Sequence, residues 1–327
     1  MAFPYPQSES CMPSVSVAIC THNPRQDYLA RVLEALKAQT LSRSTWELLI
    51  IDNASNPPAS PSIDLSWHPN ARIIVEAELG IMLARLRAMR EFSGELLVFL
   101  DDDNVLAEDY LERCLELFAE RPDLGAVSGC LMPEYESPPP EWFAPYESWI
   151  AVRRITSSAW SNFVDERSEP VTAGMCLRRS VALAHVNAVR DNPTQRILGS
   201  RGSSLLRGED VALAKNAMKA GYTVGQFSQL KLLHLIPKRR IAPEYLFALY
   251  RHLCASGHLI SWVDEAGSKP IRVSWRMLAR AAFRFVKGNQ ISRRLVIEEL
   301  RGFQLARNTA RTWSKAEQNN SANDNKR

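Results

Sequence analysis

Apolar runs alternate with helix-like periods along the first 130 residues, and this alternation constrains the fold more than any other feature. Residues 15–20 (VSVAIC), 48–51 (LLII), 72–75 and 96–100 (LLVFL) have the composition of buried strands. Between the first two runs, leucine and valine side chains at 29–36 follow the i, i+3, i+4, i+7 spacing of an amphipathic helix. Strand–helix alternation favours βαβ units and a mainly parallel sheet with helices on both faces. We therefore predict an α/β fold.

The same kind of pattern continues less regularly to residue 240. We expect further helices over 80–92, around 111–118 and over 209–220, and further strands over 171–177, 222–227 and 230–236. Residues 134–170 differ, because they contain three consecutive prolines and several aromatic side chains between Trp142 and Phe163. We interpret this segment as a long loop. Its aromatic side chains are either a platform for stacking sugars or part of the core.

Composition and charge exclude several classes of protein. The net charge of the 327 residues is +4, but residues 271–327 hold 13 Lys+Arg against 4 Asp+Glu, so the excess lies at the C-terminal end. No nucleic-acid-reading motif accompanies it, and we expect no nucleic-acid partner. The six cysteines lack C-x-x-C spacing, and there is neither a signal-peptide pattern nor an apolar run of about 18 residues. We expect a cytoplasmic protein without a transmembrane helix.

Carboxylates stand at the ends of predicted strands, which meet at one edge of a parallel sheet. Asp101–Asp103 follow the LLVFL strand directly. Three adjacent carboxylates repel one another unless a cation compensates, and Mg²⁺ or Mn²⁺ prefers such oxygen ligands. Asp52 ends an earlier strand, and Glu209-Asp210 open a predicted helix. Structural alternatives are a helix cap at Asp103, an Asx-turn at Asp52 and an ordinary helix start at Glu209.

Seven motifs, in this order, resemble the family 2 glycosyltransferases that use the GT-A fold. The nucleotide-binding half contributes SVAICTHNP (16–24), LLIIDN (48–53), LGIMLAR (79–85) and FLDDDN (99–104). The acceptor half contributes TAGMCLRRS (172–180), RGEDVALAKNAMKAGY (207–222) and HLIPKRR (234–240). The resemblance implies one GT-A catalytic domain over 14–240, with a Rossmann-like nucleotide-sugar-binding half (14–130) and an acceptor-binding half (131–240).

The resemblance also implies a role for each matching residue. Those expected to bind the nucleotide sugar are Thr21, His22, Asn23, Asp52, Gly80, Arg85, Asp101, Asp102 and Arg239, with Asp52 recognising the base, usually uracil, and Arg240 as an alternative phosphate contact. Asp103 and His234 would hold Mn²⁺ or Mg²⁺. Asp210 would be the general base, supported by Glu209.

These roles imply an inverting, hexosyltransferase-type enzyme of polysaccharide biosynthesis at the cell envelope. It would move a sugar from a nucleotide sugar to a hydroxyl of a glycan or lipid-linked glycan. The resemblance implies that this donor is a UDP-sugar, the usual donor in the family. The metal would stabilise the leaving diphosphate, and a carboxylate base is worth roughly 10²–10⁴-fold in rate. Glu78 stands where the family commonly has Asn, which puts donor contacts at that loop in doubt. The absence of a Q-x-x-R-W sequence favours single transfer over processive synthesis.

Two other functions remain open. A non-catalytic nucleotide- or glycan-binding module would not need both Asp103 and Asp210, since binding alone requires no base. A sugar nucleotidyltransferase would carry a glycine-rich phosphate loop near the N-terminus, and residues 20–25 contain no glycine.

The residues outside the resemblance are assigned from composition. We expect a flexible N-terminus over 1–13, a C-terminal helical region over 241–307 and a disordered polar tail over 308–327. Within the helical region, residues 272–287 combine an apolar face with arginines along its edge. A basic amphipathic helix of this kind either packs on the catalytic domain or lies peripherally on an anionic membrane surface, here the cytoplasmic face.

Overall fold

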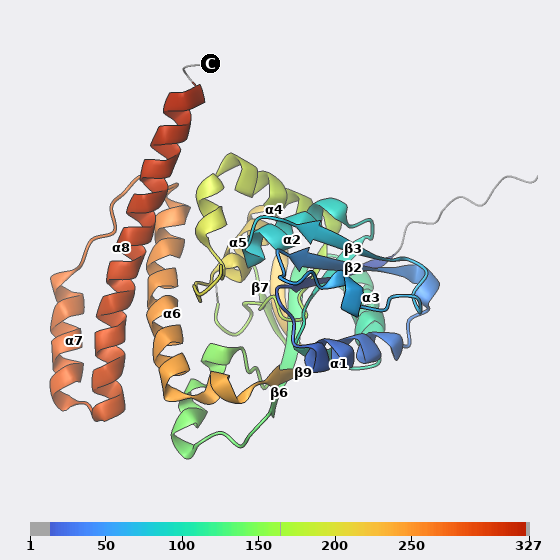
Figure 1. Ribbon diagram of the computed structural model, residues 1–327, viewed down its shortest axis with the longest axis horizontal. Coiled ribbons are helices and arrows are strands. Elements are labelled where there is room, and N and C mark those ends of the chain that lie inside the picture. The colour runs from blue at the N-terminus through green and yellow to red at the C-terminus, as the bar shows by residue number, and fades with distance from the viewer. Residues whose placement is uncertain (1–13, 164, 325–327) are drawn as a thin grey trace, which may run out of the picture.

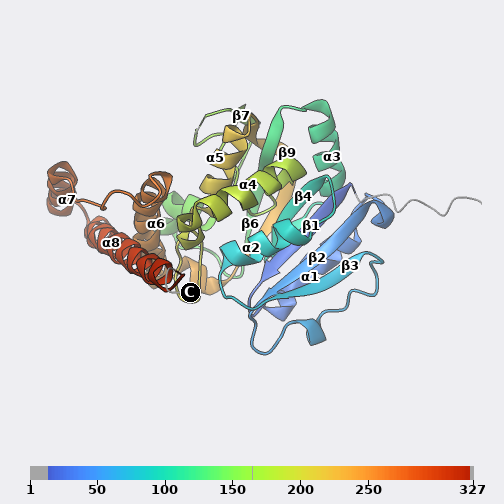
Figure 2. The same cartoon turned by 90° about the horizontal axis from the view of Figure 1, so that it is seen from above.

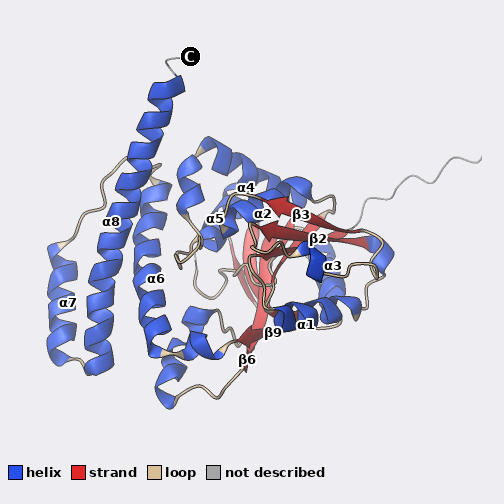
Figure 3. Ribbon diagram, in the orientation of Figure 1, coloured by secondary structure: helices blue, strands red, loops and turns tan. Residues whose placement is uncertain are grey.

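A nine-stranded sheet forms the centre of the protein. The computed structural model describes residues 14–163 and 165–324, and the strand order is β3-β2-β1-β4-β8-β6-β9-β5, with β7 beside β9. The strands, red in Figure 3, are β1 Val15–Thr21, β2 Trp46–Asn53, β3 Ala71–Glu76, β4 Leu96–Asp101, β5 Asn104–Leu106, β6 Leu124–Tyr135, β7 Ala159–Ser161, β8 Cys176–Arg178 and β9 Thr223–Ile236.

The first half of the sheet is parallel, as the alternation predicts, and the second half is mixed. β3, β2, β1 and β4 pair in parallel, so the carboxyl ends of β1, β2 and β4 lie at one edge. β8 is antiparallel to both β4 and β6, whereas β6 and β9 are parallel. β5 turns back directly after β4 and pairs with β9, so that Asn104 lies opposite His234. This pairing brings the acidic triplet beside β9.

Helices cover both faces of the sheet (Figure 2). α1 (Gln26–Lys37) and α3 (Tyr110–Glu120) lie on one face, and α2 (Ile81–Glu91), α4 (Arg179–Asp191) and α5 (Glu209–Lys219) lie on the other. Alternate residues of β1 enter the two cores: Val17 packs toward α1 and α3, whereas Ala18 packs toward α2, α4 and α5. Burial on both sides explains the continuous apolar strands, and each large core side chain contributes about 1.5–3 kcal/mol.

Three C-terminal helices stand beside the sheet domain (Figure 1). They are α6 (Pro243–Asp264), α7 (Trp275–Lys287) and α8 (Gln290–Asp324). α6 packs along α8 and shares a core with α2 and α4, in which Met82, Val189 and Leu259 are buried. α7 is the outermost of the three. Among the described helices, none combines the length and the hydropathy that a bilayer span requires.

The structure corrects several expected boundaries. The strand expected over 171–177 is only β8, because Gly174 has φ +72, a backbone conformation that interrupts a strand. The two strands expected over 222–236 are one, β9. The segment 134–170 contains a 3-10 helix, Glu141–Ile150, and β7.

The expected disordered tail is also wrong over most of its length. Helix α8 continues to Asp324, and within it Ala306 and Ala310 are buried against α6 and Trp313 packs on the same cluster. The tail was assigned from its polar composition, which hides the contacts made by Ala310 and Trp313. Residues 1–13 and 325–327 lie outside the described part of the chain, so the expectation for the N-terminus stays a prediction.

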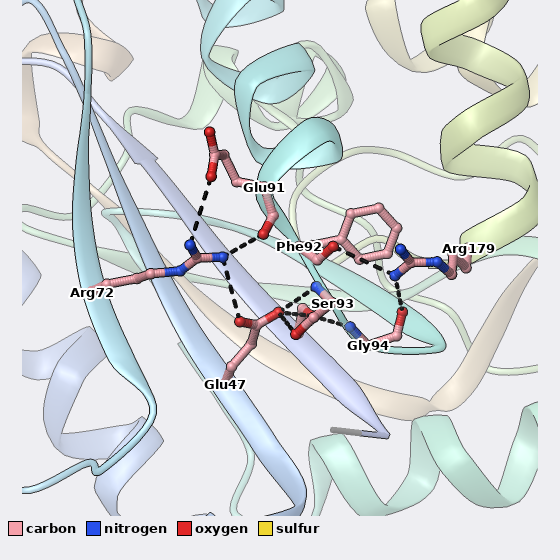
Figure 4. A network of polar contacts seen from close by, with 8 residues as sticks. Glu47, Arg72, Glu91, Phe92, Ser93, Gly94 and Arg179 are labelled. Atoms are coloured by element: carbon pink, nitrogen blue, oxygen red, sulfur yellow. Dashed lines mark hydrogen bonds and ion pairs between the residues drawn. The ribbon is translucent and has the colours of Figure 1, made fainter. Parts of the chain in front are cut away.

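The buried carboxylate of Glu47 links several strands at the edge of the sheet opposite to the carboxyl ends of β1, β2 and β4 (Figure 4). Glu47 of β2 accepts hydrogen bonds from Ser16 Oγ at 2.5 Å and from the backbone N–H and hydroxyl of Ser93 at 2.6 and 2.8 Å. Arg72 of β3 lies 3.7 Å from the same carboxylate. Glu47 therefore ties β1, β2, β3 and the turn before β4 together.

Candidate active site

A cavity of about 1090 Å³ opens at the carboxyl ends of β1 and β4. Its wall combines the two predicted halves of the domain with one face of α6. The predicted site residues on this wall are His22, Asn23, Arg85, Asp101, Asp102, Asp103, Glu209, Asp210, His234 and Arg239. Thr21, Asp52 and Gly80 are buried and do not line the cavity. The fold thus gathers most of the predicted residues in one place.

Asp103 forms the centre of a buried charged cluster. Its carboxylate lies 3.2 Å from a guanidinium nitrogen of Arg240 and 3.6 Å from His234 Nε2, and it accepts a hydrogen bond from the Asn104 amide at 3.0 Å. Burial alone would raise the pKa of Asp103, but Arg240 and His234 outweigh it, so the pKa is lowered and the carboxylate is charged. Arg240 Nη1 also lies 3.0 Å from His234 Nε2.

The neighbouring carboxylate, Asp102, has a different environment. Burial and the charge of Asp103 raise the pKa of Asp102 to about 7, although a hydrogen bond from the Thr21 hydroxyl opposes the shift. Thr21 therefore contributes to the site by holding Asp102 from behind rather than by facing the cavity. Near neutral pH Asp102 is thus only partly ionised beside the charged Asp103, which lowers their mutual repulsion.

The placement of Asp103 and His234 would allow both to bind one divalent cation. The Asp103 carboxylate oxygen and His234 Nε2 are 3.6 Å apart, and a cationic group, the guanidinium of Arg240, contacts both of them at 3.2 and 3.0 Å. Within the residues that the structure describes, no three His, Cys, Asp or Glu side chains are grouped to hold a metal. The chain therefore offers at most a partial shell, which suits Mg²⁺ because this ion usually takes its remaining ligands from phosphates and water.

Arg85 connects the two halves of the cavity. Its side chain is 5% exposed, and it donates to Glu209 Oε1 at 2.6 Å and to Asp101 Oδ1 at 3.0 Å. The other oxygen of Glu209 is buried and has no hydrogen-bond partner among the described residues. Burial raises the pKa of Glu209, and Arg85 acts against this shift. Glu209 is thus held by Arg85 and points away from open solvent.

Asp210 is placed differently from its neighbour Glu209. It lies at the first turn of α5 on the cavity wall, and one of its oxygens accepts the N–H of Val211 at 2.9 Å. Arg153, which sequence reasoning did not single out, lies nearby: burial lowers the pKa of Arg153, and the charge of Asp210 opposes that shift. Of the two carboxylates at the start of α5, Asp210 is the one available to a molecule in the cavity.

The residues behind the wall shape its loops. Asp52 is 2% exposed, and its two oxygens accept backbone N–H groups of Ser55 and Ala59, three and seven residues further on, so both oxygens hold the loop that follows β2. The side chain of Asn53 accepts the N–H of Gly80 at 2.7 Å and donates to the carbonyl of Glu78. Asn53 was not predicted as a site residue, although it stands in the LLIIDN motif.

The aromatic segment contributes to a core and to the cavity wall. Phe143 is fully buried and belongs to a core shared with α6. Trp149 lies on the cavity wall and stacks on Tyr250 of α6, with ring centroids 4.7 Å apart and an interplanar angle of 18°. Stacking of this kind fixes the orientation of the Trp149 ring, so one aromatic side chain of the segment is presented to the cavity.

Comparison with known proteins identifies the domain that forms this cavity. A family model described as Glycosyl transferase family 2 matches residues 16–176. Residues 16–176 belong to glycosyl transferase family 2. This matched segment of the family 2 protein includes β1 to β4, the acidic triplet and the first residue of β8.

Two curated relatives extend the match beyond that segment. This family 2 protein is 24% identical over 224 residues to a Bradyrhizobium diazoefficiens protein named N-acetylglucosaminyltransferase, which covers 66% of this chain and 44% of that protein. It is 27% identical over 221 residues to glycosyltransferase AglE of Haloferax volcanii, covering 66% of this chain and 64% of AglE. The chain thus spans less than two thirds of the length of either relative.

A solved structure covers nearly the whole chain. The crystal structure of S. aureus TarS 1-349 aligns with a TM-score of 0.50 at 11% sequence identity, over 93% of this chain and 92% of that one. At this identity the similarity concerns the fold alone. It confirms the predicted α/β fold of the GT-A type with a C-terminal helical extension.

Proposed function

We propose that this chain is an inverting glycosyltransferase that moves a sugar from a UDP-sugar to a hydroxyl of a glycan or lipid-linked glycan. The observation that carries the proposal is the single cavity in which Asp101–Asp103 and Glu209-Asp210 face one space and are joined through Arg85. With a bound cation, the cluster Asp101–Asp103 suits a nucleoside diphosphate. The pair Glu209-Asp210 suits an acceptor hydroxyl. Family membership and the names of the relatives support the same class of reaction.

In the proposed reaction, Asp210 takes the proton from the acceptor hydroxyl as that oxygen attacks the anomeric carbon. Glu209 is unsuited to this task because Arg85 holds one of its oxygens and the other is buried. Attack from the side opposite to the leaving nucleoside diphosphate inverts the anomeric centre. Arg239 and Arg240 lie on the cavity wall and would meet the phosphate charges. A Mn²⁺ or Mg²⁺ ion held by Asp103 and His234 would supply Lewis-acid stabilisation to the leaving diphosphate.

The nucleotide is the first part of the proposal to test. Thermal unfolding of the full chain would be recorded with UDP, GDP, CDP, ADP or dTDP, each with and without Mn²⁺. A ligand at about 100 times its Kd adds roughly 2.7 kcal/mol, which raises the Tm by several degrees. We expect a Mn²⁺-dependent shift with UDP that Asp103→Asn abolishes. Asp109→Asn is the matched control, because that carboxylate pairs with Arg113 on the surface of α3. No shift with any nucleotide would contradict the proposal.

Transfer is tested separately from binding. UDP-N-acetylglucosamine is the first donor to try, given the name of one relative. UDP release in the presence of mixed glycan acceptors should fall roughly 10²–10⁴-fold in Asp210→Asn, whereas the UDP-induced shift in Tm should remain. A variant that keeps its full transfer rate would show that Asp210 is not the base. If UDP binds and no donor is turned over, the binding-module alternative is the better description.

A further inference from the structure

The apolar face of α7 is left uncovered by the rest of the described chain. Ala281 is the one buried residue of this helix. Its large apolar side chains are instead exposed: Trp275 73%, Val286 70%, Phe283 66%, Leu278 47% and Phe285 42%. Globular proteins rarely gather so many large apolar side chains on one exposed helix face unless another surface covers it.

The residues of α7 divide into three sectors around the helix axis. Successive residues of an α-helix turn by about 100°, so Trp275, Ala279, Ala282 and Val286 form one line with Leu278 and Phe283 beside it. Met277 and Ala281 lie on the opposite side, where Ala281 is buried and α7 packs against α8. Arg276, Arg280 and Lys287 form a third sector, between the exposed apolar line and the side that faces α8. The exposed apolar stripe is therefore bordered by positive charge.

The charge of this region is of one sign. Residues 266–297 contain eight Lys and Arg and no Asp or Glu. Arg284 pairs with Glu299 and Arg294 with Glu298, both on α8. Among the side chains that the structure describes, no carboxylate lies within 4.0 Å of Arg272, Arg276, Arg280 or Lys287. These four cations are free to meet an anionic partner.

We propose that α7 docks this protein on a membrane surface with anionic headgroups. The stripe from Trp275 to Val286 enters the boundary between headgroups and acyl chains, and the arginines beside it contact lipid phosphates. Trp275 stands at one end of the stripe, and tryptophan is enriched at this boundary because its ring is apolar and its N–H is polar. Thirteen residues make a helix about 20 Å long that lies in the membrane plane.

A second copy of the chain fits this face less well than a lipid surface does. A two-fold interface places the same patch of both copies in contact. Arg276, Arg280 and Lys287 would then meet their own counterparts without a carboxylate between them, which is unfavourable. An anionic bilayer offers acyl chains to the apolar stripe and negatively charged headgroups to the cations beside it.

The docking surface is connected to the cavity through α6. Ser256, Gly257 and Ile260 of α6 line the cavity, and the same helix packs along α8, which carries α7. Docking through α7 would therefore hold the cavity at a defined distance from the bilayer, as a lipid-linked acceptor requires. The inference itself does not depend on sugar transfer, because vesicle binding can be measured without donor or acceptor.

Flotation of the full chain with lipid vesicles tests the proposal. Vesicles of phosphatidylcholine alone would be compared with vesicles that also contain phosphatidylglycerol, at low and high salt. We expect association with the anionic vesicles at low salt and little with the neutral ones. Arg276→Gln with Arg280→Gln should weaken association about 25-fold, since each cation contributes about fivefold. Phe283→Ser with Val286→Ser should weaken it at least about tenfold.

Matched control variants on α4 separate the loss of the α7 surface from the general effect of removing an exposed apolar or basic side chain. Leu183→Ser replaces an apolar side chain of α4 that is 44% exposed, and Arg190→Gln removes an arginine of α4 whose side chain is 71% exposed. Both variants should bind vesicles as the wild type does, and all four variants should unfold at the wild-type temperature. Absence of flotation by the wild type at low salt would overturn the proposal, and so would undiminished flotation of both α7 variants. A wild-type dimer in light scattering that Phe283→Ser with Val286→Ser converts to a monomer, without vesicle binding, would assign the face to a second copy.

Discussion

At the residue scale, the two halves of the site depend on Arg85. Its planar guanidinium reaches Asp101 and Glu209 at once, and an ammonium group is a point charge that cannot span both. Arg85→Lys should therefore leave either Asp101 or Glu209 without its partner and shift the position of these acidic groups. We expect kcat/KM for transfer to fall roughly 100-fold, with a smaller change in UDP binding. Arg87→Lys is the control, because Arg87 pairs with Glu91 on the outer side of the same helix. Equal kinetics for both variants would remove Arg85 from the positioning role.

A second residue-scale prediction concerns His185, which lies outside the cavity. Its ring is 1% exposed, Asn216 Nδ2 donates to Nδ1 at 2.8 Å, and burial lowers its pKa to about 4. The unfolded chain protonates this group near pH 6.5. Between about pH 6.5 and 4 the unfolded state thus binds more protons, and stability is lost as the pH falls, by roughly 3 kcal/mol at the acid end. Urea unfolding of His185→Gln should show lower stability at neutral pH but a flatter dependence on pH. Parallel pH profiles for both proteins would assign the dependence to other groups.

At the scale of elements, Glu47 holds four segments at the edge of the sheet away from the cavity. Glu47→Ala leaves the N–H of Ser93 and the hydroxyl of Ser16 without their acceptor, in a site that is 6% exposed. We expect a loss of about 3 kcal/mol in the free energy of unfolding with an unchanged Kd for UDP. Glu95→Ala, at an exposed position of the same turn, should change stability by less than about 0.5 kcal/mol. A loss of UDP affinity in folded Glu47→Ala would show that the two sheet edges are coupled.

Helices and strands with a regular pattern of apolar residues could be predicted from the sequence. Elements that form only by pairing with residues far along the chain could not. β1, β2, β4 and α1 follow from their apolar patterns, and the structure confirms them. β5 has only three residues, and its strand character comes from pairing with Leu232–His234, more than a hundred positions later. The end of α8 was missed because burial of Ala306 and Ala310 against α6 is a tertiary effect that local polarity hides.

At the scale of the whole molecule, the sequence indicated which residues share the cavity but not how they are joined. Strand ends and ordered motifs were enough to place Asp103 and Asp210 in one site. The bridge from Arg85 to Glu209 depends on how α2 sits against α5, across 124 positions of sequence. The ion pair of Arg240 with Asp103 likewise depends on the register of β5 with β9. Neither spatial relation leaves a local trace in the chain.

Also at the scale of the whole molecule, the buried strands β1 and β2 are held firmly, whereas the outer helix α7 is held loosely. The residues of β1 and β2 are all buried, whereas α7 buries Ala281 alone, so α7 amides should exchange by local opening and those strands only by global unfolding. Hydrogen–deuterium exchange with mass spectrometry should therefore respond differently to the two proposed ligands. UDP with Mn²⁺ should slow exchange around Asp101–Asp103 and leave α7 unchanged, and anionic vesicles should do the reverse. Slow exchange of α7 in the free protein would contradict an uncovered face. Protection of α7 by UDP would mean instead that the cavity and the docking surface are energetically coupled.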